Sequence, residues 1–122
     1  MPKVNRFEDL RCWQEARVLV REIYRIAEEG RLSKDYETRS QLKRAALSCM
    51  NNIAEGFGKY SSKEFIHYLD TAHNSASEVK SMLYVLFDLE YVDKEKIMML
   101  QEKTEEVKAS ILAFIKYLSR RG

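Results

Sequence analysis

The chain is poor in residues that interrupt helices. Its 122 residues include one proline, Pro2, and four glycines, none of them inside a segment with periodic apolar residues. Proline removes a backbone donor and glycine costs conformational entropy, so both are unfavourable in the interior of a helix. Their distribution excludes a break within any periodic segment and permits long helices between the glycines.

Long apolar runs and cysteine clusters are also missing. No run approaches the roughly 18–20 apolar residues of a membrane span, and the first residues lack the apolar stretch of a secretory signal. We therefore expect a cytoplasmic protein with no membrane partner. The two cysteines, Cys12 and Cys49, lack zinc-type spacing and lie on or beside apolar faces. We expect both to be reduced and buried, without a disulfide framework.

The patterns typical of enzymes are absent as well. The chain has no glycine-rich phosphate loop and no nucleophile elbow. Glu64-Phe-Ile-His67 matches the Glu-x-x-His pattern of di-iron bundles, but such sites need the motif from two helices, and the other histidine, His73, lies on the same segment. The spacing turns His67 away from the apolar face, so a solvated histidine is expected. We predict no enzyme activity, no catalytic residue, no metal, no cofactor and no small-molecule substrate.

Charge is nearly balanced, with 21 Lys and Arg against 19 Asp and Glu. The resulting net charge of +2 is too small to indicate a nucleic-acid partner. Its distribution is uneven: residues 1–59 carry +3, residues 60–92 carry −3 and residues 93–122 carry +2. This polarity permits local electrostatic recognition without requiring it.

What the chain does have is apolar residues at alternating gaps of three and four. They form four sets: Trp13/Ala16/Val20/Ile23/Ala27, Leu42/Ala46/Cys49/Ile53, Phe65/Leu69/Ala72/Ala76/Val79/Leu83/Leu86 and Leu100/Thr104/Val107/Ile111/Phe114/Leu118. Each set occupies one face of a helix, and a period near 3.5 favours shallow left-handed packing. We predict an all-α, left-handed, up-down-up-down antiparallel four-helix bundle that forms one domain over residues 1–122.

The flanking residues set the expected helix ends, at about residues 8–29, 34–56, 62–89 and 94–119. Gly30 ends the first helix, because glycine tolerates the left-handed cap conformation. Gly56 opens a short connection, and Ser61-Ser-Lys-Glu64 forms a capping box that begins the third helix. Short connections make successive helices antiparallel neighbours.

Two polar columns run beside the apolar faces. They are Gln41, Arg44, Ser48, Asn52 and Glu55 on the second predicted helix, and Glu64, Thr71, Ser75 and Glu78 on the third. If the columns face each other, Arg44 lies near Ser75 and Glu78. One interpretation is an interhelical hydrogen-bond seam that fixes the register. The alternative is a polar subunit interface or ligand groove.

A basic row lies on the first predicted helix. It comprises Arg17, Arg21 and Arg25, and Arg39 with Lys43 forms a shorter row on the second helix. Like charges four residues apart on a helix destabilise it by a few tenths of a kcal/mol. Another interaction must therefore offset the repulsion within the row. The row is either a solvated face, neutralised in part by Glu22, Glu28 and Glu29, or a phosphate-binding surface suited to a nucleic-acid backbone.

Surplus apolar residues widen two of the faces. On the first predicted helix they are Cys12, Leu19 and Ile26, and on the fourth they are Met98, Met99, Leu112 and Tyr117. Monomers seldom leave such surface exposed, so it favours self-association.

Several segments, spread over nearly the whole chain, resemble a known family. They are Phe7–Ala16, Gln41–Ser48, Asn52–Gly56, Glu64–Phe65 and Ala72–Glu78. They are similar to the four-helix-bundle family named for proteins encoded by intervening sequences in bacterial 23S ribosomal RNA genes. The Asn-Ile-Ala-Glu-Gly segment, at its distance from Phe-x-x-Leu-x-x-Trp, is the most specific of them. Asn74 departs from the family, which usually has glycine there.

The resemblance implies a bundle that assembles into a ring-like homopentamer without catalytic activity. It also implies kinship with the accessory variability proteins of diversity-generating retroelements, which bind nucleic acid. From these features we expect a homo-oligomeric binding module associated with RNA or a ribonucleoprotein, with Arg17, Arg21, Arg25, Arg39 and Lys43 as the binding residues. The alternative is a structural adaptor whose oligomer presents a surface to a protein partner.

Overall fold

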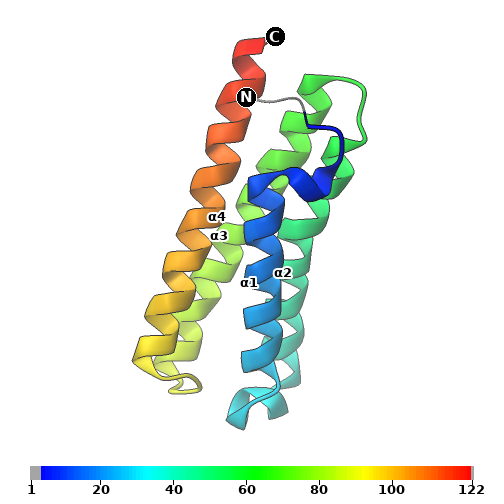
Figure 1. The fold of residues 1–122 in the computed structure, drawn as a ribbon. Helices are drawn as coiled ribbons and strands as arrows, with labels where there is room; N and C mark the ends of the chain where they lie inside the picture. The colour runs from blue at the N-terminus through cyan, green and yellow to red at the C-terminus, as the bar shows by residue number, and fades with distance from the viewer. Residues whose placement is uncertain (1–3, 122) are drawn as a thin grey trace.

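The computed structural model describes residues 4–121, and within them the ordered elements are helices, with no strand (Figure 1). Two 3-10 turns, Phe7–Asp9 and Gly30–Lys34, accompany four long helices. The long helices are α1 (Arg11–Ala27), α2 (Tyr36–Phe57), α3 (Ser62–Asp88) and α4 (Lys94–Arg121). The predicted all-α four-helix bundle is confirmed.

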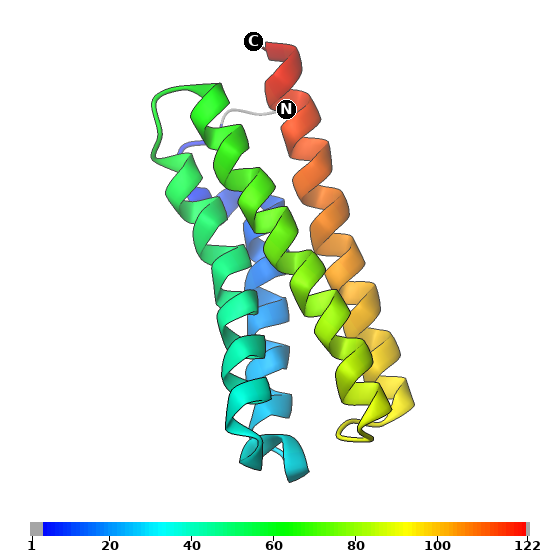
Figure 2. The ribbon, with the colours of Figure 1, turned by 180° about the vertical axis from the view of Figure 1, so that it is seen from behind.

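Each helix packs against its neighbours in the chain, and α1 also packs against α4. The α1–α2 pair and the α3–α4 pair therefore form opposite sides of the bundle. The connections within these two pairs lie at one end of the bundle, and the α2–α3 connection lies at the other end together with the C-terminal end of α4 (Figures 1 and 2).

The two connections at the shared end are hydrogen-bonded to each other. Arg31 donates to the backbone oxygen atoms of Leu89 and Glu90 at 3.0 and 3.1 Å. The Tyr91 hydroxyl donates to Asp35 at 3.0 Å. Arg31 thereby satisfies backbone acceptors at the end of α3 that the helix leaves free. Segments almost 60 positions apart in the chain are held side by side.

Helix ends follow the local capping chemistry and differ by a few residues from the predicted ones. α1 begins at Arg11 rather than near residue 8, because the preceding residues form a 3-10 turn and Leu10 is extended. Asp35 caps α2 by accepting from the Thr38 backbone N–H at 3.2 Å. Ser61 Oγ accepts from the Glu64 backbone N–H at 3.1 Å, which begins α3 as predicted. Gly56 lies inside α2 rather than in the connection.

The buried core consists of the predicted periodic faces. On α2, α3 and α4 every residue of the predicted sets is buried, and on α1 only Trp13 and Val20 are half-buried. Both cysteines are buried as predicted, and burial raises the pKa of the Cys12 thiol to about 12.

The expected surplus of apolar surface on α1 is wrong. Cys12, Leu19 and Ile26 are buried in the core of the single chain. The reason is geometric: α1 packs against both α2 and α4, so a wide apolar arc is needed on it. On α4, by contrast, Met98 and Leu112 remain exposed, and Met99 and Tyr117 are partly buried against the core.

Candidate functional site

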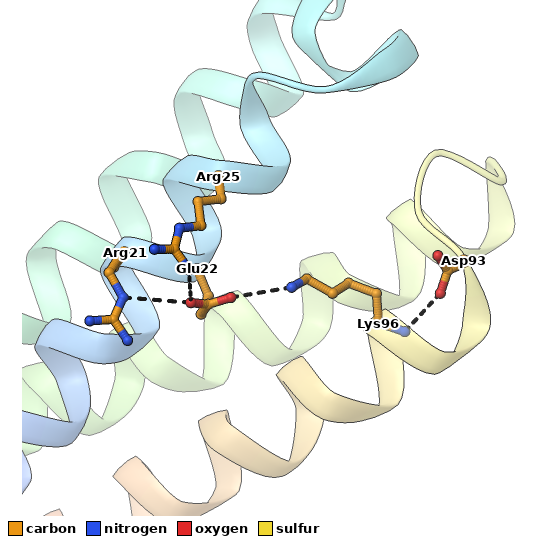
Figure 3. A network of polar contacts seen from close by, with 5 residues as sticks. All are labelled: Arg21, Glu22, Arg25, Asp93 and Lys96. Atoms are coloured by element: carbon orange, nitrogen blue, oxygen red, sulfur yellow. Dashed lines mark hydrogen bonds and ion pairs between the residues drawn. The ribbon is translucent and has the colours of Figure 1, made fainter.

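The basic row of α1 surrounds a carboxylate that the bundle buries. Arg17, Arg21 and Arg25 are exposed, whereas Glu22 is only 7% exposed. Glu22 accepts a hydrogen bond from Arg25 at 2.9 Å and lies 3.6 Å from the Arg21 Nε (Figure 3). From α4, the Lys96 ammonium donates to its other oxygen at 3.2 Å. One carboxylate thus joins three cations and links α1 to α4.

Helix α4 places Lys96 at this carboxylate. Asp93 accepts from the Lys96 backbone N–H at 2.9 Å and so caps the first turn of α4 (Figure 3). The Lys96 side chain, fixed at its root by that turn, extends toward α1. The position of Lys96, which pairs with the Glu22 carboxylate, is therefore set by the start of α4.

The charge of Glu22 is maintained against its burial. Burial acts to raise the pKa of Glu22, but the hydrogen bond and charge of Lys96 and the charge of Arg25 outweigh it, so the pKa lies below its usual value. A carboxyl group whose pKa falls on folding stabilises the fold above its unfolded-state pKa. That contribution is lost as pH falls through the folded-state pKa.

Replacing Glu22 with glutamine should therefore lower stability mainly at neutral pH. We expect the Glu22→Gln variant to lose about 1–2 kcal/mol at pH 7, because the three cations keep access to water. The loss should shrink below pH 4.5, the ordinary glutamate pKa, as the wild-type carboxylate becomes protonated. Urea unfolding of both proteins at pH 7 and pH 3 measures this. A Glu106→Gln control at an exposed position should show no such dependence, and an equal Glu22→Gln loss at both pH values would contradict the assignment.

Arg17 differs from the other two arginines of the row. Its guanidinium lies over the ring of Trp13, 5.7 Å from the ring centre, and it has no carboxylate partner within residues 4–121. Phe7 packs against the edge of the same ring. The aromatic ring holds Arg17 in place while its charge stays unneutralised.

Arg39 and Lys43, the two basic residues predicted on α2, pair with a different carboxylate from the one that joins the α1 row. Glu28, just after α1, pairs with Lys43 at 3.1 Å and with Arg39 at 3.8 Å. The hydrogen bond from Lys43 and the charges of both cations hold the pKa of Glu28 below its usual value. Lys43 also lies over the Tyr24 ring, and both basic side chains are more shielded from solvent than those of the α1 row.

The predicted polar columns meet in part between α2 and α3. Gln41 donates to Glu78 at 3.2 Å, and the hydroxyls of Ser48 and Ser75 are 2.8 Å apart. Asn52 donates to the backbone oxygen of Ser48 at 2.8 Å. These contacts join the two helices at two levels and so fix their register.

Other members of the columns stay outside this contact. Arg44 and Glu55 are exposed, with no side-chain hydrogen bond within the described part of the chain. Thr71 bonds to the backbone oxygen of His67 on its own helix.

His67 is exposed, as the spacing predicts. In residues 4–121 no group of three or more potential ligand side chains is placed to hold a metal ion, and no helix there is long and apolar enough to cross a membrane.

Sequence reasoning missed the partner of Glu22. Lys96 lies 74 positions away, and no periodic signal connects the two residues. The available hint was that Glu22 borders the wide apolar arc of α1, where a carboxylate needs cationic partners when the arc is buried.

Comparison with known proteins places this bundle in a family. The model of the 23S rRNA-intervening sequence protein family matches residues 8–113. No curated protein matches the chain. A solved structure from Bacteroides thetaiotaomicron VPI-5482, a protein of unknown function from the S23 ribosomal protein family, is 21% identical with a TM-score of 0.78. The match covers 86% of this chain and 95% of that one, and it shows the shared fold. The chain belongs to the family of 23S rRNA-intervening sequence proteins.

Proposed function

We propose that this protein is a cytoplasmic, non-enzymatic, homo-oligomeric binding module that associates with RNA or a ribonucleoprotein through the basic row of α1. The observation that carries the proposal is the arrangement of Arg17, Arg21 and Arg25 on one exposed face. Their neighbour Lys96 adds a fourth cation, and Arg21, Arg25 and Lys96 share one carboxylate, that of Glu22.

The geometry of the row suits a phosphate backbone. Residues four apart on a helix are separated by about 6 Å along its axis, so the three guanidinium groups form a line rather than a cluster. Each guanidinium has donors left over after its contact with Glu22 or Trp13. The buried carboxylate orients two of these side chains without cancelling the positive charge of the surface, which supports electrostatic binding of phosphates.

RNA binding measured across a salt series tests this proposal. We expect affinity for RNA at low salt that falls steeply as salt increases, because binding releases counterions. Arg17→Glu and Arg21→Glu should each weaken binding by about tenfold or more and reduce the salt slope. Lys63→Glu, an equal charge change at an exposed position on α3, is the matched control. No binding at low salt, or equal affinity in all variants, would show that the nucleic-acid part is wrong.

Self-association is the second part of the proposal, and the family resemblance supports a ring of five copies. Light scattering of the purified protein measures the number of copies directly. A protein that self-associates but shows no RNA affinity would instead be a structural adaptor for a protein partner. That alternative is supported by the large apolar side chains that α3 and α4 leave exposed.

A further inference from the structure

A polar pocket opens beside the first turns of α1, at the end of the bundle that holds the α2–α3 connection (Figure 1). Its volume is about 590 Å³, and sites for small ligands typically measure roughly 300–1,000 Å³. Trp13 and Arg17 line it from α1, and Arg6, Glu8 and Asp9 line it from the segment before α1. We call this site the Trp13 pocket.

The wall around Trp13 is fixed by contacts within the chain. The Phe7 ring meets the Trp13 ring edge-on, with 5.2 Å between the ring centres. The Gln14 side chain donates to the Glu8 backbone oxygen at 2.9 Å, which holds the 3-10 turn against α1. Trp13 is half-buried, packed in part against the core and in part facing the pocket. Because these side chains are already ordered, binding a ligand there costs less conformational entropy.

The charges in the pocket are unequally neutralised. Arg6 lies 3.8 Å from Glu8 and 3.7 Å from Asp9, so its charge is largely balanced by its own segment. Arg17 lies over the Trp13 ring and has no carboxylate partner within residues 4–121. The Glu8 and Asp9 side chains are 42% and 58% exposed, so their oxygen atoms can still accept hydrogen bonds. The pocket therefore presents a flat ring, one unneutralised guanidinium and two acceptor groups side by side.

This combination matches the chemistry of a nucleotide. A base offers a flat face for stacking on an aromatic side chain and N–H donors along its edge, and its phosphate pairs with a guanidinium. Carboxylates accept hydrogen bonds from the amino groups of bases. An acidic peptide fits less well, because its repeated carboxylates would meet Glu8 and Asp9 and it brings no base to stack on Trp13.

We propose that the Trp13 pocket binds an unpaired base of single-stranded RNA, an inference that rests on the RNA binding proposed above. The base stacks on Trp13, its edge donates to Glu8 or Asp9, and the adjoining phosphate pairs with Arg17. Bases in a duplex are paired and stacked on one another, so they do not enter the pocket, whereas the phosphates of both forms reach the arginine row. The pocket thus adds a preference for single strands to electrostatic binding.

Fluorescence of the unmodified protein tests this proposal directly. Trp13 is the one tryptophan of the chain, so the indole emission reports on this pocket alone. The probes are a short unstructured RNA and the same RNA annealed to its complement, at low salt and equal phosphate concentration. We expect the single strand to quench Trp13 and the duplex to leave its emission unchanged. Anisotropy of labelled RNA should show about tenfold tighter binding of the single strand.

Replacement of the tryptophan separates stacking from charge. Trp13→Leu keeps an apolar side chain against the core but removes the ring, so the ratio of single-strand to duplex affinity should fall from about ten to near one. Trp13→Phe restores a flat ring and should recover most of that ratio. Phe87→Leu, which removes an exposed aromatic ring on α3, is the matched control and should bind like the wild type. Thermal melts followed by circular dichroism check that each variant is folded.

The outcomes distinguish the pocket from the RNA function itself. No binding of either RNA at low salt would refute the proposed RNA association, and the pocket proposal would fall with it. Equal binding of single strand and duplex, with unchanged Trp13 emission, would leave the arginine row standing and refute the pocket. An unaltered affinity ratio in Trp13→Leu would refute it as well. So would a glutamate peptide of equal charge that bound as tightly as the single strand.

Discussion

Replacement of Leu69 with aspartate should abolish cooperative folding. Leu69 is fully buried on α3, within the core cluster shared by the helices. Removing a buried leucine costs about 2–5 kcal/mol, and an unpaired carboxylate in an apolar interior adds several more. The sum is comparable to the whole stability of a domain, about 5–15 kcal/mol. Circular dichroism during heating should show no cooperative transition.

The matched control makes the same substitution on the surface. Leu112 lies on α4 and is exposed, so Leu112→Asp should keep a cooperative melt within a few degrees of the wild type. If Leu69→Asp melted cooperatively at the wild-type temperature, the placement of α3 in the bundle would be wrong.

Replacement of Gly56 with alanine should destabilise the protein although alanine favours helices. Gly56 is buried inside α2, and a Cβ atom there would lie 2.8 Å from both Phe65 Cδ1 and Tyr68 Cβ of α3. The Phe65 ring edge can shift, but Tyr68 Cβ is attached to the backbone, so the helices must separate. Overpacking typically costs about 1–3 kcal/mol, which opposes and exceeds a helix-propensity gain of about 1 kcal/mol.

A neighbouring glycine provides the control for this prediction. At Gly58 an added Cβ would meet only the Glu55 backbone oxygen at 3.6 Å, and the φ of −80° is open to alanine. Gly58→Ala should therefore be neutral or stabilising by up to about 1 kcal/mol. Urea unfolding of both variants measures the difference, and a stabilised Gly56→Ala protein would contradict the close approach of α2 and α3.

The fold followed from the sequence because burial in a bundle is periodic. The positions at gaps of three and four became the core, and even Thr104 is buried where the period places it, with its hydroxyl bonded to the Leu100 backbone oxygen at 2.7 Å. The helix boundaries were less predictable: the pattern placed Leu10 inside the first helix and Gly56 at the end of the second, whereas Leu10 precedes α1 and Gly56 is buried inside α2.

The candidate site was predictable only as a list of cations. Spacing along α1 placed Arg17, Arg21 and Arg25 on one face, and the structure adds that Arg21 and Arg25 pair with Glu22 whereas Arg17 lies over the Trp13 ring. Glu28 lies near the row in sequence yet turns to Arg39 and Lys43 on α2. A charge on a helix border can pair within its helix or across to a neighbour, and periodicity does not distinguish the two.

The amino-acid pattern therefore accounts for the helices, their number and their buried faces, because these depend on residues a few positions apart. The tertiary arrangement supplied the rest: the contact of Glu22 with Lys96, the absence of space beside Gly56, and the hydrogen bonds that tie the α1–α2 connection to the α3–α4 connection. Each of these depends on how far one helix slides and rotates against the next. That displacement is set by side chains from distant segments acting together, so no local pattern records it.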